Sequence, residues 1–269
     1  MQPGDEGSSQ DDGEEVSRRG LLSAGLFGVA AGVLTAAGIA AAGPPATAAS
    51  VPDAATWMHT WAQPISRLDS YTARRLDVRF PKRTIMLTID DGPHPVWTPR
   101  YLRLLAKHHV SATFNVIGEQ VHENRKLLKA AVGEGHHLGN HTWHHPLNLP
   151  SLSAHRIRDE LLDTTDAIVR ACGFRPRQFR APGGVWGPDV FAEVARQQMM
   201  PLGWDIDPRD WALPGVAAIR GAMLAARPHD IILCHDGGGN RSETYRALET
   251  VIPALLARDF TFVTLPAPQ

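Results

Sequence analysis

The sequence contains little cysteine, little net charge and few charged residues for its length. Its 269 residues include two cysteines, Cys172 and Cys234, which are too few for a scaffold held together by disulfides, so we expect both in the core. A charged fraction of 20% and a net charge of −1 argue against a basic nucleic-acid-binding protein. The hydrophobic content of 43% excludes disorder of the whole chain and is ample for a buried core.

Residues 1–48 do not have the pattern of a folded domain and are typical of an export signal. Six acidic residues precede the pair Arg18-Arg19, and an uncharged run then extends over residues 21–42. Ala-Thr-Ala at 46–48 is a small-x-small cleavage pattern. This combination resembles a twin-arginine signal peptide, which predicts a secreted or cell-envelope protein without a membrane span once the signal is cleaved. An uncleaved membrane anchor and a chance arginine pair are the alternatives.

Residues 81–269 are predicted to form one α/β domain, preceded by a lead-in segment at 49–80. The lead-in contains Trp57 and Trp61 but no clear period, and we expect it to pack on the outside of the domain. Beyond it, short apolar runs alternate with stretches of i, i+3, i+4 apolar spacing, which indicates a parallel sheet. Seven such units are one short of the usual eight-fold barrel, so we expect a distorted (β/α)7 barrel, with a doubly wound open sheet as the alternative. The predicted strands are 84–90, 112–118, 136–141, 178–182, 200–206, 230–236 and 261–265, and the predicted helices are 98–109, 119–133, 153–172, 188–198, 215–226 and 243–258.

Ionisable residues gather where the predicted strands end. In barrels of this kind the active site is built at the carboxyl ends of the strands. A purely structural chain has no reason to deliver ionisable residues from five strands to one rim, so the placement predicts an enzyme. The residues are Asp90 and Asp91 after the first strand, His141 after the third, Arg180 near the end of the fourth, Asp205 and Asp210 after the fifth, and His235 at the end of the sixth.

The spacing of His141 and His145 is compatible with a metal site. Two histidines four residues apart can converge on one metal from a single turn, and His144 between them should point elsewhere. Asp90 and Asp91 would face opposite ways in an extended strand, so a turn must begin there for both to reach a pocket. Two histidines and one aspartate leave positions open for water and substrate, as a catalytic Zn²⁺ site requires, although the same set serves Fe(II). Taken singly, exposed histidines and an Asp-Asp-Gly-Pro surface turn are both ordinary.

Five motifs in order resemble the polysaccharide deacetylases of carbohydrate esterase family 4, over residues 82–266. That family has a distorted (β/α) barrel, in agreement with the count of units above. Ile89 stands where phenylalanine is commoner in the family, and Gly183 stands where many relatives carry an aromatic residue. The motifs are Thr-Ile-Asp-Asp-Gly-Pro at 88–93, Gly-Asn-His-Thr-Trp-His-His-Pro at 139–146, Arg-Ala-Pro-Gly-Gly at 180–184, Asp-Pro-Arg-Asp-Trp at 207–211 and Leu-Cys-His at 233–235.

The resemblance also implies a role for each motif residue. Asp91, His141 and His145 look like ligands of a divalent metal, usually Zn²⁺ in this family, with Co²⁺ or another divalent ion as alternatives. Asp90 looks like the general base, paired with Arg180, and His235 like the general acid, steered by Asp210. A backbone N–H near Gly183 would stabilise the oxyanion, and Trp211, with Trp186 as a further candidate, would contact the acetyl methyl group. His108, His109, His136 and His137 lie outside the motifs and are expected on the surface or in packing.

Three functions are compatible with these residues. The first is an exported, metal-dependent deacetylase that acts on N-acetylglucosamine in chitin oligomers or peptidoglycan. The second is an O-acetyl esterase of the same family that acts on acetylated xylan. The third is a non-catalytic glycan-binding module, but the loss of a ligand or base that marks such proteins is not seen here, because all five motifs are intact. The expected partner is thus an acetylated glycan, and no nucleic acid.

Overall fold

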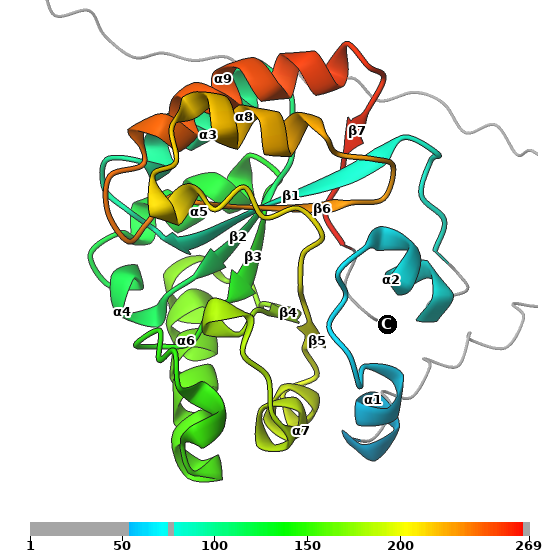
Figure 1. The fold of residues 1–269 in the computed structure, drawn as a ribbon. Coiled ribbons are helices and arrows are strands. Elements are labelled where there is room, and N and C mark those ends of the chain that lie inside the picture. Colours follow the sequence, from blue (N-terminus) through cyan, green and yellow to red (C-terminus); the bar gives the residue numbers. More distant parts are fainter. Residues whose placement is uncertain (1–53, 75–77, 266–269) are drawn as a thin grey trace, which may run out of the picture. The chain divides into compact units, whose positions relative to one another are not determined.

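The structure is a computed structural model that describes residues 54–74 and 78–265 (Figure 1). The signal predicted at residues 1–48 lies outside the described residues. The strands are β1 (Thr84–Gly92), β2 (Thr113–Val116), β3 (His137–Asn140), β4 (Gln178–Phe179), β5 (Met200–Pro201), β6 (Ile231–His235) and β7 (Thr261–Phe262). The helices are α1 (Ala54–Thr60), α2 (Leu68–Arg74), α3 (Thr98–Lys107), α4 (Gly118–Val121), α5 (Arg125–Gly133), α6 (Ala154–Cys172), α7 (Pro188–Arg196), α8 (Val216–Leu224) and α9 (Ser242–Leu256).

The strands form one parallel sheet that curls into a half-barrel. Their order is β5-β4-β3-β2-β1-β6, and β7 pairs with the start of β1. Strands β1 to β5 follow one another across the sheet in chain order and β6 lies on the other side of β1, whereas the strand order of a doubly wound sheet reverses near its middle. The expected distorted seven-stranded α/β barrel is therefore confirmed. Strand β1 pairs with β2, β6 and β7 and is buried along almost its whole length, as expected for a parallel strand covered on both faces.

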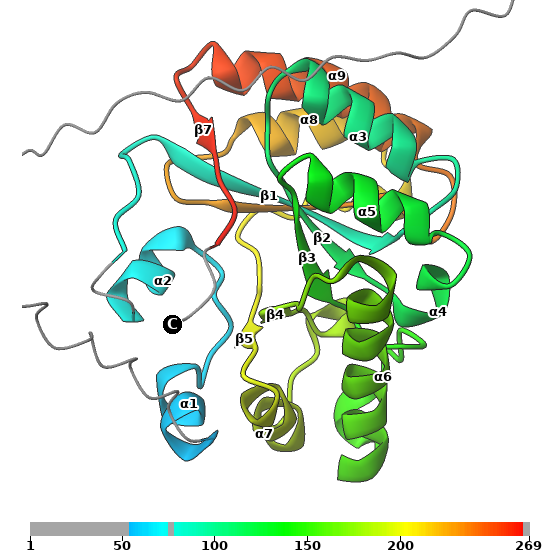
Figure 2. The same cartoon turned by 180° about the vertical axis from the view of Figure 1, so that it is seen from behind.

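The helices cover the outside of the curled sheet, as the two opposite views show (Figures 1 and 2). Neighbours in this outer layer include α8 with α9, α9 with α3, α3 with α5, α5 with α6, and α6 with α7. Their apolar faces and the sheet enclose the main core, which contains Ile89, Phe114 and Leu248. None of the helices in the described ranges is long and apolar enough to cross a membrane.

One helix and three strands differ from the bounds that the sequence predicts. The helix expected at 119–133 is two helices, α4 and α5, because the chain turns at residues 122–124, where the Asn124 side chain donates to the Gln120 carbonyl. Such local side-chain bonds compete with helix continuation. The strands β4, β5 and β7 contain only two residues each. Beyond β4 and β5 the chain bends into loops, and these two loops form part of the rim of the barrel.

The lead-in segment fills the seam between β5 and β6 instead of lying wholly on the outside. Ile65 pairs with Leu202 just after β5, and Arg67 pairs with Asp230 just before β6. The Arg67 guanidinium also forms a salt bridge with the Asp230 carboxylate. Ile65 is fully buried in a second apolar cluster, together with Trp57 of α1 and with Leu68 and Tyr71 of α2. The expectation of a purely external lead-in is thus wrong for residues 65–67, because the seam offers unpaired backbone groups that this extended segment satisfies.

Candidate functional site

Asp90 and Asp91 both reach the pocket because the end of β1 is bulged. Asp90 pairs with Asn115 and Gly92 with Val116, so Asp91 is an extra residue in the register with β2. Asp91 has a φ of 74°, in the left-handed region that residues other than glycine seldom adopt. The bulge re-aims one side chain of the alternating pair. The sequence predicts that a turn begins here, and this is wrong in form, because β1 continues to Gly92 and a bulge within the strand brings both carboxylates to the pocket.

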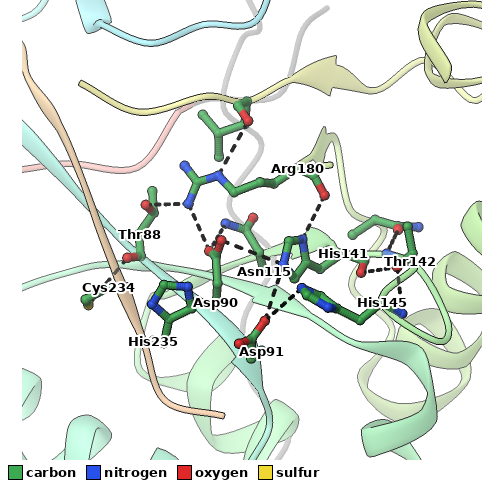
Figure 3. A network of polar contacts seen from close by, with 12 residues as sticks. Thr88, Asp90, Asp91, Asn115, His141, Thr142, His145, Arg180, Cys234 and His235 are labelled. Carbon is green, nitrogen blue, oxygen red and sulfur yellow. Dashed lines mark hydrogen bonds and ion pairs between the residues drawn. The ribbon is translucent and has the colours of Figure 1, made fainter. Parts of the chain in front are cut away.

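The carboxylate of Asp90 is buried, and hydrogen bonds hold one of its two oxygens. Its Oδ1 accepts hydrogen bonds from Asn115 Nδ2 at 2.6 Å and from Arg180 Nη1 at 2.8 Å. Arg180 is itself fully buried and donates further to the Thr88 hydroxyl and to the Gly203 carbonyl, at 2.7 and 2.6 Å. These bonds fix Oδ1 and leave Oδ2 directed towards His141, whose Nε2 lies 3.8 Å away (Figure 3).

Asp91, His141 and His145 converge as a candidate metal centre (Figure 3). Asp91 Oδ1 lies 3.4 Å from His141 Nε2 and 3.3 Å from His145 Nε2, and the three ligand atoms lie within 4.8 Å of one another. The same Asp91 Oδ1 is buried without a hydrogen-bond partner. Burial raises the pKa of Asp91, but the adjacent His141, together with the charges of His235 and His145, lowers it well below the ordinary value. A buried carboxylate oxygen that faces two imidazoles is a donor set that suits a divalent cation.

The loop that carries the two histidines is fixed by hydrogen bonds from outside the pocket. His141 Nδ1 lies 2.7 Å from the Arg180 carbonyl, so Nε2 is the nitrogen that faces Asp91. The Glu160 carboxylate on α6 accepts from the backbone N–H groups of Trp143 and His144 and contacts the His144 ring. His144 therefore points away from His141 and His145, as the sequence predicts. Hydrogen bonds from residues around a metal site commonly set the orientation of the imidazoles that bind the metal.

His235 and Asp210 form a second buried pair on the opposite wall of the pocket. His235 Nδ1 lies 2.7 Å from Asp210 Oδ1, which leaves Nε2 free to face the pocket. Asp210 is fully buried, and its Oδ2 accepts from the His235 backbone N–H and the Thr244 hydroxyl. Burial lowers the pKa of His235, but the hydrogen bond and charge of Asp210 outweigh it, so the net shift is upward. The protonated imidazole is thus favoured, as a proton donor near neutral pH requires.

These side chains surround one cavity of about 400 Å³. Seven of the nine predicted site residues line it, whereas Arg180 and Asp210 lie behind the wall and act through Asp90 and His235. Gly183 lies at a φ of 60° beside the Leu147 side chain, and Trp211 is half exposed at the rim. The lining residues predicted from the sequence are Asp90, Asp91, His141, His145, Gly183, Trp211 and His235.

Sequence reasoning missed several residues of the site. Asn115 was not singled out, although a lone amide in the apolar run of β2 is a signal that could have found it. Glu160, Trp204 and Leu147 carry no comparable signal, because their relation to the site arises only on folding. Asp207 lies in the fourth motif and lines the cavity, but it was given no role.

Several residues that the sequence analysis considered lie outside the site. Trp186 does not line the main cavity and instead stacks on Phe191. Asp205 forms an ion pair with Arg67 of the lead-in, 3.3 Å away, and so does not support the metal centre. His136 is buried and accepts from the Ala112 N–H, which agrees with the expected packing role. Both cysteines are free thiols.

Asp236 is a further buried carboxyl close to the site. It is fully buried between Thr98, whose hydroxyl donates to Oδ2, and Gly92, where a Cβ atom would collide with the carboxylate. Its Oδ1 has no hydrogen-bond partner. Burial raises the pKa of Asp236 to about 7, with the Thr98 hydrogen bond opposing the shift and the charges of Asp91 and Asp90 adding to it.

Comparisons with known proteins agree with this geometry. The sequence profile of a family described as polysaccharide deacetylase matches residues 77–202. A chitooligosaccharide deacetylase of Bradyrhizobium sp. (strain ANU 289) is 43% identical over 68% of this chain and 90% of that protein. A peptidoglycan-N-acetylglucosamine deacetylase of Bacillus cereus is 39% identical over 68% of this chain and 87% of that protein. The crystal structure of a peptidoglycan N-acetylglucosamine deacetylase in complex with 4-naphthalen-1-yl-N-oxidanyl-benzamide is similar with a TM-score of 0.69 and 30% identity, over 78% of this chain and 94% of that one.

The raised pKa of Asp236 predicts a pH-dependent stability for the metal-free protein. Between about pH 4 and pH 7 the folded state keeps a proton on Asp236 that the unfolded state releases, so the free energy of unfolding falls as pH rises. We expect Asp236→Asn to remove this contribution, which is at most about 1.4 kcal/mol per pH unit. Urea unfolding of both proteins at pH 5 and pH 7.5 measures the difference. An equal change with pH in the two proteins contradicts the assignment.

Proposed function

The chain belongs to the polysaccharide deacetylase family, and on that premise we propose that it hydrolyses the acetamido groups of N-acetylglucosamine in chitin oligomers or peptidoglycan. Members of the family are metal-dependent hydrolases. The observation that carries the proposal is that one cavity is lined by a triad able to hold a metal, by a buried carboxylate and by a hydrogen-bonded histidine. The activities of the similar proteins from Bradyrhizobium and Bacillus cereus support this choice of substrate.

Asp91, His141 and His145 are proposed to hold the metal, and we propose Zn²⁺ as the ion. One carboxylate oxygen and two imidazole nitrogens are ligands that zinc prefers, and three protein ligands leave room for water and substrate. The unpartnered Asp91 Oδ1 supports this assignment, because a cation would satisfy it. When bound, the ion supplies a Lewis acid that polarises a carbonyl group and lowers the pKa of water. Co²⁺ or another divalent ion could occupy the same set.

Asp90 is proposed as the general base. Its Oδ1 is occupied by Asn115 and Arg180, so Oδ2 is the oxygen that can take a proton from the attacking water. As that proton moves to Asp90, the water oxygen bonds to the acetyl carbon. Arg180 places positive charge beside the carboxylate, and Asn115 adds a neutral donor. Both are positioning residues, since neither lines the cavity.

His235 is proposed as the general acid for the second half of the reaction. The carbon–nitrogen bond breaks as Nε2 gives its proton to the departing sugar nitrogen, so that acetate and a free amine are the products. Asp210 keeps the ring oriented and favours its protonated form. The backbone near Gly183 is proposed to stabilise the carbonyl oxygen as it gains charge, and Trp211 to contact the acetyl methyl group.

We also propose that the protein is exported to the cell envelope or secreted. The support is the Arg18-Arg19 pair, the uncharged run at 21–42 and the Ala-Thr-Ala site at 46–48. Mass spectrometry of the protein recovered outside the cytoplasm of the source cells tests it. A mature chain that starts near residue 49 is expected, and a full-length chain confined to the cytoplasm refutes the proposal.

Acetate release tests the proposed reaction and its base together. The full chain loaded with Zn²⁺ is expected to release acetate from chitopentaose, and chelation is expected to stop it. Asp90→Asn should keep its metal but lose about 100-fold or more in rate, because the proton acceptor is removed. Asp205→Asn, whose side chain pairs with Arg67 outside the cavity, serves as the matched control. Acetate from acetylated xylan alone would favour the esterase function, and a wild-type rate in Asp90→Asn would refute the base.

The metal ligands are tested by metal content rather than by rate. His141→Ala is expected to lose most of the bound Zn²⁺, because its Nε2 is one of the three converging ligand atoms. His144→Ala should keep the metal, since His144 faces Glu160. Atomic emission spectroscopy on the dialysed proteins gives the answer. Undiminished zinc in His141→Ala would exclude the proposed ligand set.

The pH–rate profile tests the pair His235 and Asp210. The general acid must be protonated, so activity falls as pH rises above the pKa of His235. Asp210 raises that pKa, and Asp210→Asn is therefore expected to move the alkaline limb of kcat/KM to lower pH while the acidic limb stays in place. Asp205→Asn should reproduce the wild-type profile. An alkaline limb that does not move in Asp210→Asn would show that another group donates the proton.

A further inference from the structure

A second groove lies next to the catalytic cavity and shares one wall with it. Its volume is about 500 Å³, and Trp204 lines both the groove and the cavity. One side of the groove is built from the lead-in, by Gln63, Ser66, Ser70 and Arg74. The other side consists of the loops after β4 and β5, with Trp186 and Trp204.

The chemistry of this groove is that of a sugar-binding surface. Two indole rings offer apolar faces, while an amide, two hydroxyl groups and a guanidinium offer hydrogen bonds. Pockets of this kind combine an apolar wall with a few polar groups that orient the ligand. A pyranose ring has the matching pattern, with C–H faces and hydroxyl groups around its edge. A purely apolar ligand would leave the polar side of the groove unused.

The groove is held in shape by contacts behind it. The Arg74 guanidinium lies 5.5 Å from the centre of the Trp61 ring and donates to the Gln63 carbonyl at 2.9 Å. Trp186 stacks on Phe191 with ring centroids 5.0 Å apart. Trp204 packs close to Gly184, where a Cβ atom would collide with the indole. The aromatic walls and the arginine therefore need little reordering when a ligand binds, which favours affinity.

We propose that this groove binds a sugar unit of the glycan next to the unit that is deacetylated. The inference rests on the proposed function, because a polymeric substrate must leave the catalytic cavity along its rim, and Trp204 connects the two spaces. The lead-in wall at 63–74 precedes residue 77, where the match to the family profile begins. The subsite thus depends on a segment of this chain outside the matched region. It predicts a preference for longer oligomers.

The experiment fills the groove and compares substrates of different length. Ser70→Trp places an indole in the groove, and Ala73→Trp places the same side chain on an exposed position of α2 that does not line it. For the Zn²⁺-loaded full chain, kcat/KM on chitopentaose is expected to fall by about threefold to tenfold in Ser70→Trp, mainly through KM, a loss typical of one aromatic contact. Chitobiose should be cleaved at the wild-type rate by both variants. Equal losses on both substrates, or an equal loss in Ala73→Trp, would overturn the proposal.

A second variant distinguishes loss of the subsite from misfolding of the protein. A binding measurement distinguishes it from failure of the proposed reaction. Gln63→Ala removes one polar group of the groove with little steric change and should lower chitopentaose affinity without changing the thermal unfolding midpoint. Calorimetry measures the binding of chitopentaose to Asp90→Asn and to the double variant that also carries Ser70→Trp, and this measurement requires no turnover. Weaker binding in the double variant supports the subsite even if no acetate is ever released, in which case the proposed function alone fails. Unchanged binding in both the double variant and Gln63→Ala excludes the subsite.

Discussion

The buried ion pair between Asp90 and Arg180 is the interaction on which the rest of the site depends. The two charges lie 2.8 Å apart in the interior of the sheet, with both side chains almost wholly shielded from water. Such a pair is favourable only when the remaining donors and acceptors are satisfied, and Arg180 achieves this with the Thr88 hydroxyl and two carbonyls. The Thr88 hydroxyl belongs to β1, and the two carbonyls belong to the chain after β5. The guanidinium therefore also fixes the distance between these two parts of the curled sheet.

The same pair explains why two adjacent aspartates differ in what they can do. Asp90 ends a regular stretch of β1 and is enclosed by donors, whereas Asp91 is displaced by the bulge into a left-handed conformation and meets the imidazoles. Thr142 and His145 also have positive φ values, of 66° and 57°. Non-glycine residues in this region cost free energy, so the sheet and the Glu160 carboxylate must hold the loop in place. Two of the three proposed ligands, Asp91 and His145, thus lie in strained backbone.

The sequence predicts the site well wherever a rule connects position in a strand to position in space. The carboxyl ends of parallel strands share one rim, which is why residues as distant as Asp91 and His235 could be placed together. Asn115 has no predicted role, because a single amide in an apolar strand does not by itself indicate what it contacts. The insertion of Ile65 and Arg67 into the seam could not be foreseen either, since short extended segments have no period and their partners lie far along the chain. The contacts of Glu160 could not be foreseen for the same reason, because the backbone N–H groups that donate to its carboxylate come within reach only once α6 packs.

The seam has a consequence for the order in which the molecule assembles. Ile65 and Arg67 are among the first described residues to be synthesised, yet they pair with residues 202 and 230, beyond almost all of the sheet. Contacts between such distant positions pay a large chain-closure entropy and form slowly. We therefore expect the half-barrel from β1 to β5 to associate before the lead-in has both of its partners, with closure of the seam as a late step of folding. On the same ground, we expect the side that carries the lead-in to be among the first regions to open.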